Sequence, residues 1–299
     1  MNLPTLKQLR YFVSLEKHQH FGNAAKACFV SQSAFSVAIK ELESQLGAQL
    51  VDRTNKSVTI TRTGREIASH ARRCLCDIEY LTELAHSDQK PLTGRLNIGI
   101  IPTIAPFILP ELLPELRQTY PELKLYLRED TTKALHQRLL EGELDLILIA
   151  LPYKLSNVEV LPLYKDHFSL ICHKDTTLID PKNYSLAKLP KESILLLEDG
   201  HCLRDHALSA CKIRNQDTVS RFAASSLLTL VSMVDSDLGI TYLTEMAQNS
   251  SLLDNTDIKA YPLNEKSFRE IGFAWRKGSA REAEFRLLGD TFCELNITN

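Results

Sequence analysis

The sequence predicts an α+β multidomain fold in three parts: a winged helix-turn-helix head in residues 1–62, a linker helix and hinge in 63–93, and a two-lobed α/β domain in 94–299. Three observations predict it. Short helices with a tight turn open the chain, a heptad repeat follows, and strands then alternate with helices. A chain of 299 residues can bury a separate core in each of two or three such domains.

The head is predicted to contain two helices joined by a tight turn, after a first helix. Apolar residues recur at helical spacing over Leu6–Lys17, and Phe21–Cys28 places small residues on one face. Ser31 is a favourable N-cap for the next helix, Gln32–Leu46, which Gly47 ends. Small side chains let the second and third helices cross closely, which is typical of the helix-turn-helix.

A longer helix is predicted to begin at Thr63, and residues 87–93 are predicted to be its hinge. Its apolar residues step by four and three, as a heptad seam does. A regular seam on a charged helix favours a partner helix, so we expect dimerisation here; a helix packed only on its own domain is the alternative. The seam consists of Ile67, Ala71, Cys74, Ile78, Leu81 and Ala85.

From residue 94 onward, strands and helices alternate, which predicts an α/β domain with a mainly parallel sheet. A ligand or sensing site is expected between its two lobes. The predicted strands are 95–101, 123–127, 144–151, 168–172, 194–197, 239–243 and 270–275. The predicted helices are Pro110–Thr119, Thr132–Glu141, Leu203–Ile213, Ser226–Asp235 and Arg281–Glu294.

The composition is that of a globular protein, with 44% hydrophobic and 24% charged residues. No segment approaches the roughly 18 apolar residues of a spanning helix, and the start of the chain does not resemble a signal peptide, so we expect a cytoplasmic protein without a membrane partner. The net charge of −2 is unevenly divided: residues 1–66 carry +4 and the remainder −6. A basic head fits contact with phosphate at one end of the chain.

The head offers candidate contacts to double-stranded DNA. In a helix-turn-helix, Ser31, Gln32 and Ser33, with Ser36 one turn on, would meet base edges and phosphates in the major groove. The amide of Gln32 can pair bidentately with adenine. The alternative is a plain cap at Ser31 and a solvated Gln32. Val51–Ile60 predicts a two-stranded wing, whose basic residues would contact phosphate or the minor groove; these are Arg53 and Lys56.

The segment FGNAAKACFVSQSAFSVAIKELESQLGAQLVDRT, followed by TRTG, resembles the N-terminal signature of LysR-type transcription regulators over nearly all of residues 4–66. It departs from that signature at Ser33, usually proline, and at Val51, usually aromatic or leucine. The resemblance implies a dimerisation helix in the linker and a periplasmic-binding-protein-like effector domain. It also implies a homodimer or homotetramer that acts with RNA polymerase.

The seven cysteines do not suggest a disulfide framework or a metal site. Their number is odd, and a cytosolic protein keeps its thiols reduced. No second cluster accompanies Cys74 and Cys76, which are too close for a CxxC pair, so we predict no metal and no cofactor. Five cysteines occupy apolar or seam positions and are interpreted as packing residues: Cys28, Cys74, Cys76, Cys172 and Cys293.

Cys202 is different, because it lies at the start of a predicted helix beside His201 and Arg204. A helix N-terminus and neighbouring cations favour the reactive thiolate. Cys211 follows nine positions later, and it could simply pack in the core beside Leu208. Nine helical residues separate two α-carbons by about 13 Å, whereas a disulfide needs roughly 4.4–6.8 Å. The two thiols could therefore pair only if the helix unwound, as a two-state switch requires.

The string LLLEDGHCLRD resembles the segment around the reactive cysteine of the peroxide-sensing LysR-type regulators. IGIIPTIAPFILP, ITYL and GFAWRKGS resemble further segments, while SSLLTL at 225–230 departs from them. By this resemblance Cys202 is the peroxidatic thiol, Cys211 resolves it, and a cellular thiol reductant reverses the change. The same resemblance assigns the surroundings of the peroxide and the thiolate to His201, Thr103, Thr132, Asp205 and Arg276.

Four of these surrounding residues also have a simpler interpretation. Thr103 could end a strand, Thr132 could cap a helix, Arg276 could form a surface ion pair, and His201 could be solvated. For the whole chain, the resemblance implies a regulator, mainly an activator, of antioxidant genes, and not an enzyme. The alternatives are a LysR-type regulator that binds a metabolite between its lobes and a thiol peroxidase. A solute-binding protein is disfavoured, because such proteins need an export signal.

Overall fold

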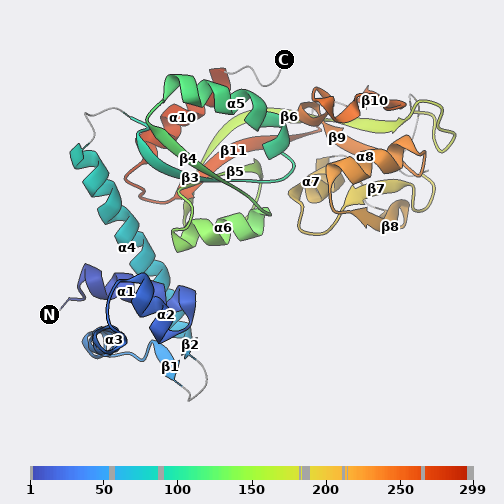
Figure 1. Ribbon diagram of the computed structural model, residues 1–299. Coiled ribbons are helices and arrows are strands. Elements are labelled where there is room, and N and C mark those ends of the chain that lie inside the picture. The colour runs from blue at the N-terminus through green and yellow to red at the C-terminus, as the bar shows by residue number, and fades with distance from the viewer. Residues whose placement is uncertain are drawn as a thin grey trace. The chain divides into compact units, whose positions relative to one another are not determined.

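The computed structural model describes residues 3–53, 58–86, 91–181, 183, 189–210, 213, 215–263 and 267–294 (Figure 1). It divides into two compact units. The first consists of Met1–Lys90 with Leu140–Glu143, and the second of Pro91–Leu139 with Leu144–Asn299. Within the described parts of the chain, no helix is both long and apolar enough to cross a membrane.

Three helices form the head of the first unit: α1 (Leu6–His18), α2 (Phe21–Ala27) and α3 (Gln32–Leu46). Thr5 opens α1 with a capping box, the Ser31 hydroxyl caps α3 by accepting from the Ala34 N–H, and Gly47 ends α3 in the left-handed region. The buried faces of the helices meet in one apolar core, which contains Phe12, Leu15, Ala24, Ala25, Phe35, Ile39 and Leu42.

The predicted wing is present as two antiparallel strands, β1 (Val51–Arg53) and β2 (Val58–Ile60). Its predicted centre, Asn55-Lys56, lies outside the described residues. Helix α4 (Arg62–His86) follows, and its first half packs on the core of the head through Ile67 and Ala68. Further along the same helix two seam residues are exposed, Ile78 by 38% and Leu81 by 59%.

The second unit contains two lobes, each with its own core. In the first lobe, β3 (Gly94–Ile100) pairs in parallel with β4 (Leu123–Glu129) and with β5 (Leu146–Leu151). Buried leucines and isoleucines of this sheet pack against the helices that cover it. Those helices are α5 (Ala105–Thr119), α6 (Thr132–Glu141) and α10 (Glu282–Glu294).

The second lobe contains two short sheets and its own helices. The second half of β6 (Val158–His173) pairs with β9 (Thr241–Thr244) and β10 (Ile258–Pro262), while β7 (Ile194–Leu197) pairs with β8 (Val219–Ala224). Helices α7 (Cys202–Ala210), α8 (Leu227–Asp235) and α9 (Glu245–Gln248) belong here, with short 3₁₀ turns at Gln216–Thr218 and Ser251–Leu253.

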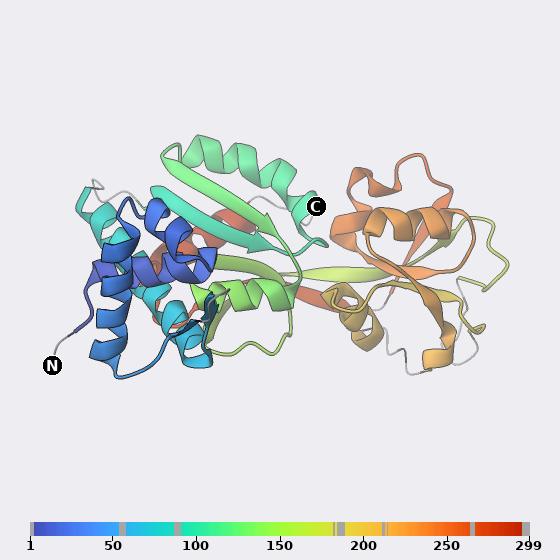
Figure 2. The same ribbon diagram turned by 60° about the horizontal axis from the view of Figure 1, so that its bottom comes forward.

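The sheet connecting the lobes is mixed, and the prediction of a mainly parallel sheet was wrong. Strands β6 and β11 (Phe268–Arg276) both run from one lobe into the other (Figures 1 and 2). They are antiparallel to each other, and β11 is also antiparallel to β5. The chain leaves the first lobe along β6 and must return to it along β11, which forces the opposite direction.

Helix α5 begins at Ala105, five residues before the predicted start, and includes Pro110 and Pro114. A proline inside a helix costs roughly 3 kcal/mol. Three residues spaced by four are buried on one face of α5 and pack in the core of the first lobe: Ile108, Leu112 and Leu116. Tertiary packing therefore outweighs the local cost of the prolines.

Candidate functional site

The reactive cysteine predicted from the sequence lies where two helix N-termini meet. Cys202 is the first residue of α7 and Thr132 is the first residue of α6. The Cys202 Sγ and the Thr132 Oγ1 are 2.7 Å apart, and both residues are buried. The two helices come from different lobes, so the site joins the lobes. Helix N-termini attract negative charge, which suits a sulfur that must ionise in order to react.

Burial controls the charge state of this sulfur. The pKa of Cys202 is raised above its ordinary value, first because burial disfavours the thiolate. The hydrogen bond with Thr132 and the positive charge of Arg269 lower the pKa, while the negative charge of Asp205 raises it. The expectation that position and nearby cations would favour the thiolate is therefore not met. Only 7% of the residue is exposed, and desolvation outweighs the favourable groups.

A buried ion pair lies beside the site, where β6 and β11 cross between the lobes. Arg269 and Asp166 are directly opposite on these strands, with 2.9 Å between Nε and Oδ2. The guanidinium also donates to the hydroxyl of Thr103 at 2.9 Å and to the Thr103 carbonyl at 2.8 Å. The other oxygen of Asp166 accepts from the Met246 N–H. Every polar part of the pair thus has a partner, which a buried pair requires.

A second histidine, His206, is buried on the same helix as the cysteine. Its Nε2 lies 3.2 Å from the Pro152 carbonyl, and its pKa is lowered, chiefly by burial. Tyr153 lies next along the chain, and its pKa is raised by burial and by the nearby charges of Cys202 and Asp205. The surroundings of the sulfur therefore include a histidine and a tyrosine that the sequence analysis did not single out.

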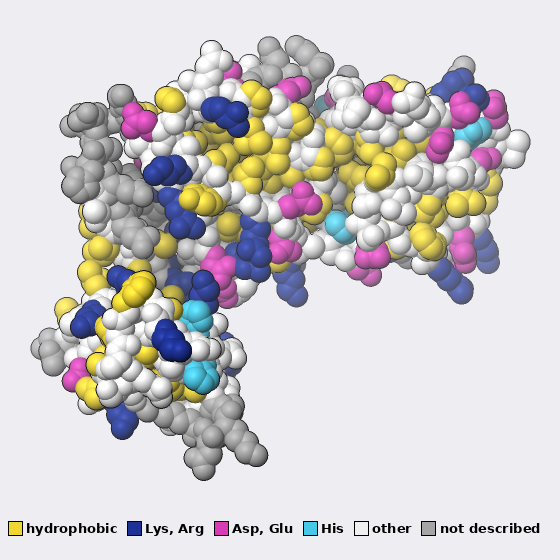
Figure 3. Space-filling view, viewed as in Figure 1, with side chains coloured by type: hydrophobic (Ala, Val, Ile, Leu, Met, Phe, Trp, Pro, Cys, Tyr) yellow, Lys and Arg dark blue, Asp and Glu magenta, His cyan; other side chains and the backbone are white. Residues whose placement is uncertain are grey.

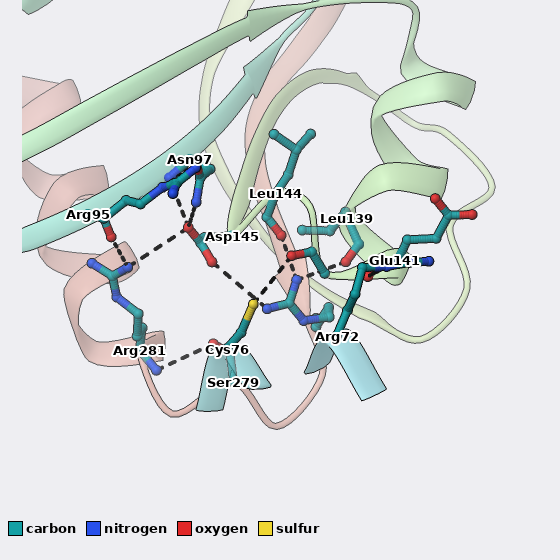
Figure 4. A network of polar contacts seen from close by, with 12 residues as sticks. Arg72, Cys76, Arg95, Asn97, Leu139, Glu141, Leu144, Asp145, Ser279 and Arg281 are labelled. Atoms are coloured by element: carbon teal, nitrogen blue, oxygen red, sulfur yellow. Dashed lines mark hydrogen bonds and ion pairs between the residues drawn. The ribbon is translucent and has the colours of Figure 1, made fainter. Parts of the chain in front are cut away.

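Arg276 does not belong to this site, contrary to the assignment made by resemblance. Its Nη1 donates to the carbonyls of Leu139 and Leu144, and its Nη2 lies 4.0 Å from Asp145. Figure 4 shows Asp145 in its polar network, next to Asn97 and Arg281. Arg276 is seven strand residues from Arg269, about 23 Å at about 3.3 Å per residue. The arginine near the sulfur is Arg269.

Three further predicted residues make no contact with the sulfur that the described part of the chain shows. His201 precedes α7 and is half-exposed; among the described residues its ring makes no hydrogen bond to the sulfur. Asp205 is exposed in the first turn of α7, and its charge opposes the thiolate. Cys211 lies outside the described residues. Thr103 and Thr132 are both buried. Thr132 contacts the sulfur directly, whereas Thr103 accepts a hydrogen bond from Arg269.

Sequence signals for the missed residues existed but were weak. Arg269 is the second residue of a strand, two positions before its apolar run, and such a charge needs a buried partner or an exposed edge. His206 follows Cys202 by four positions, which places both on one face of a helix. Neither signal identifies its partner, because Asp166 and Pro152 are distant in the sequence.

The other cysteines are in varied surroundings. Cys172 is buried, and burial raises its pKa, which fits the packing role. Cys74 and Cys293 are exposed, so packing within this chain does not account for them, while Cys28 and Cys76 are half-buried. Packing of Cys74 against a partner helix on the heptad seam stays a prediction. In the described part of the chain, no group of three or more metal-binding side chains comes together.

In the head, the predicted DNA-reading residues Ser31, Gln32 and Ser33 are exposed at the N-terminus of α3, and Ser36 is half-exposed one turn later. The Ser31 hydroxyl both caps α3 and lies 3.1 Å from that of Ser33. Arg53 ends β1, and its side chain and all of Lys56 lie outside the described residues.

Comparison with known proteins agrees with this architecture. Residues 6–65 match the family described as bacterial regulatory helix-turn-helix protein, lysR family, and residues 89–294 match the LysR substrate binding domain. The chain is 40% identical to the regulator EstR of Acinetobacter baylyi, over 99% of this chain and 98% of that one. It is 34% identical to the dual regulator OxyR of Escherichia coli, over 95% and 93%.

Solved structures give the same result. A full-length OxyR variant from Pseudomonas aeruginosa superposes with a TM-score of 0.81 at 34% identity, over 99% of this chain and 97% of that one. The reduced regulatory domain of OxyR2 from Vibrio vulnificus is 39% identical, with a TM-score of 0.66, and covers 70% of this chain and 99% of that one.

Proposed function

The chain belongs to the LysR family of bacterial helix-turn-helix regulators, and from that premise we propose that it controls antioxidant genes in response to hydrogen peroxide through Cys202 and Cys211. DNA binding and transcription regulation are the roles of the whole family. The matched families and relatives are regulators, so the chain is a regulator and not an enzyme.

One observation carries the proposal: Cys202 lies at the junction of two helix N-termini, with the Thr132 hydroxyl at its sulfur. This is an unusual environment for a cysteine that only fills space, because a packing cysteine needs neither a polar partner nor a positive potential. The pKa of Cys202 is raised, so the thiol is the resting form. The same hydroxyl can donate to the thiolate once the proton leaves.

The proposed chemistry has two steps. The Cys202 thiolate attacks one oxygen of hydrogen peroxide, the O–O bond breaks, and sulfenic acid and hydroxide form. The Cys211 thiolate then attacks the Cys202 sulfur, which forms the disulfide and expels a second hydroxide. Together the two thiols lose two electrons and the peroxide gains them. A cellular dithiol reductant reverses the change by thiol–disulfide exchange.

The geometry of α7 supports a switch rather than a simple thiol reaction. The helix occupies Cys202–Ala210, and Cys211 is the next residue. The eight helical steps from Cys202 to Ala210 span about 12 Å. One further residue can bring Cys211 at most about 3.8 Å closer, so the disulfide requires α7 to open. Because α7 contacts both lobes, we infer that its opening changes their arrangement and, through it, the spacing of the DNA-binding heads.

Two apolar surfaces support assembly into a homodimer or homotetramer. On α4, Ile78 and Leu81 continue the heptad seam into solvent. On the first lobe, α5 and β4 form a groove among the apolar side chains gathered in the space-filling view (Figure 3), lined by Leu113, Leu116, Arg117, Tyr120, Pro121, Leu123, Leu125 and Leu127. A second copy of the chain is the occupant proposed for both, and RNA polymerase the proposed partner at the promoter.

A second candidate keeps the DNA binding but replaces the peroxide with a small metabolite between the lobes. The observation that favours it is the 40% identity to EstR, a regulator whose name does not mention peroxide, against 34% to OxyR. The two candidates differ in what Cys202 does, since the metabolite sensor would not need its sulfur.

The deciding experiment combines thiol mapping with DNA footprinting. The full chain is treated briefly with stoichiometric peroxide, digested without reduction and mapped by mass spectrometry, while a footprint is recorded on its own promoter in both states. We expect a Cys202–Cys211 link and a changed footprint, both lost in Cys202→Ser and kept in Cys293→Ser, the matched change of an exposed thiol. If the Cys202→Ser protein still activated its target genes normally, the proposal would fail and the metabolite candidate would take its place.

A further inference from the structure

Helix α7 presents two different faces to the two lobes. Leu203 and Ala207 belong to the core of the second lobe. Cys202 and His206 are also one turn apart, on a neighbouring face. Both reach partners of the first lobe: Cys202 contacts Thr132 of α6, and His206 contacts the Pro152 carbonyl just beyond β5. Two polar contacts therefore attach α7 to the first lobe.

A third polar side chain of α7 makes its contacts within its own lobe. Arg204 forms an ion pair with Asp199 at 3.0 Å and donates to the Leu197 carbonyl at 3.2 Å. The contacts of Arg204 therefore keep α7 attached to the second lobe, whereas opening α7 affects its contacts with the first lobe. When Cys202 is oxidised and leaves Thr132, the bond from His206 to Pro152 is the polar contact between α7 and the first lobe that remains among the described residues.

The chemistry of that contact fixes the state of the imidazole. A carbonyl oxygen can only accept, so Nε2 carries the proton, and a neutral ring then has a bare lone pair at Nδ1. Nδ1 is buried and has no hydrogen-bond partner among the described residues. Only 9% of His206 is exposed. When α7 lies against the first lobe, here called docked, His206 gains one hydrogen bond through Nε2 but leaves the acceptor Nδ1 unsatisfied. This combination holds the helix weakly.

We propose that His206 is a positioning residue that holds α7 against the first lobe, so that breaking its bond to Pro152 sets the rate at which Cys202 can reach Cys211. Only the second part of this inference, the rate at which Cys202 reaches Cys211, rests on the proposed redox function. The holding contact itself is a property of the reduced protein and can be measured without any oxidant.

Acid provides an independent way to break the contact. Burial and the charge of Arg269 disfavour protonation of docked His206, whereas the Pro152 carbonyl and Asp205 on α7 favour it, and the net pKa lies below its ordinary value. The released ring regains an ordinary pKa near 6.5 and binds a proton more readily. As the pH falls below about 6.5, protonation therefore stabilises the released helix relative to the docked one.

The test is hydrogen–deuterium exchange of the amides of Cys202–Ala210 in the reduced full chain, followed by the rate of disulfide formation after one equivalent of peroxide. His206→Leu should raise both rates, on the order of fivefold, since a typical hydrogen bond is worth about that factor. His206→Gln should stay near wild type, because its amide can still donate to Pro152. Trapping of the sulfenic acid with dimedone should be equal in all three proteins.

The matched control is His136→Leu. His136 also contacts a backbone carbonyl through Nε2, that of Ser156 at 3.1 Å, but it lies on α6 and does not reach α7. Equal α7 exchange in wild type and His206→Leu, or the same increase in His136→Leu, would overturn the proposal.

A measurement on the wild type covers the case in which His206→Leu does not fold. After correction for intrinsic exchange, α7 of the wild type should exchange faster at pH 5.5 than at pH 7.5, and His206→Gln should not show this difference; equal behaviour of the two proteins overturns the proposal. If α7 exchange responds as expected but peroxide never links the thiols, the holding role stands and the proposed redox function fails.

Discussion

The Thr132 Oγ1 lies 2.7 Å from the Cys202 Sγ, so the first residues of two helices in different lobes meet at the sulfur that we propose reacts with peroxide. The contact opposes the effect of burial on the pKa of Cys202, and it also attaches α7 to the first lobe. One hydroxyl thus acts on both the chemistry and the position of the thiol. These two actions can be separated by experiment.

Thr132→Val should slow the reaction of Cys202 with peroxide about fivefold at pH 7, because a hydrogen bond worth about 1 kcal/mol that favours the thiolate is lost while the shape of the side chain is kept. Competition kinetics with a peroxide probe measures the rate. Thr119→Val, at an exposed threonine at the end of α5, is the matched control. An unchanged rate in Thr132→Val would show that the hydroxyl serves the docking of α7 alone.

The reactivity of Cys202 should continue to rise at alkaline pH. Its pKa is raised above 9.0 by burial, so only the small thiolate fraction reacts at pH 7, and that fraction grows until the pH passes the raised pKa. Iodoacetamide labelling of the reduced protein between pH 6 and 10, resolved by peptide, gives the profile. The exposed Cys74 is read from the same digests as an internal reference. A midpoint below pH 8 would contradict the dominance of burial.

Local sequence signals were sufficient for the head but not for the site. The caps at Ser31 and Gly47 and the periodic apolar residues are read within a few positions, and they predicted α3 to the residue. Arg276 was assigned by resemblance alone. Arg269 lies on the same strand, and only the register opposite Asp166 shows that Arg269 is the arginine buried between the lobes. His206 was missed for a related reason, since its partner Pro152 is 54 residues away.

Arg269→Met should destabilise the protein by roughly 3–5 kcal/mol, because it leaves the buried carboxylate of Asp166 without its counter-charge. Urea denaturation followed by circular dichroism measures the loss. The double variant Arg269→Met with Asp166→Leu should recover much of it, since no buried charge then remains. Arg286→Met, which removes an exposed pair with Glu282 on α10 and a cation–π contact with Trp275, should cost only about 1 kcal/mol. Equal losses in Arg269→Met and Arg286→Met would disprove the role of burial.

Leu81→Glu should weaken assembly through α4, because the change places a charge on an exposed position of the heptad seam. Sedimentation velocity of the reduced full chain should show a smaller species than the wild type at the same concentration. Leu238→Glu, at a similarly exposed leucine of the second lobe, controls for the added charge and should leave the mass unchanged. If both variants keep the wild-type mass, α4 does not form the interface.

Gln32→Ala should reduce sequence-specific binding of DNA far more than non-specific binding. Gln32 is exposed at the N-terminus of α3, and a bidentate contact to a base edge is worth roughly 1–3 kcal/mol, or about 5- to 150-fold in affinity. Genomic fragments bound by the wild type supply the specific DNA, and fluorescence anisotropy at fixed salt compares them with scrambled duplexes. Gln118→Ala, at an exposed position of α5, should leave both affinities unchanged. If Gln32→Ala weakened binding to both kinds of DNA equally, its side chain would contact the backbone and not the bases, because phosphate contacts carry no sequence information.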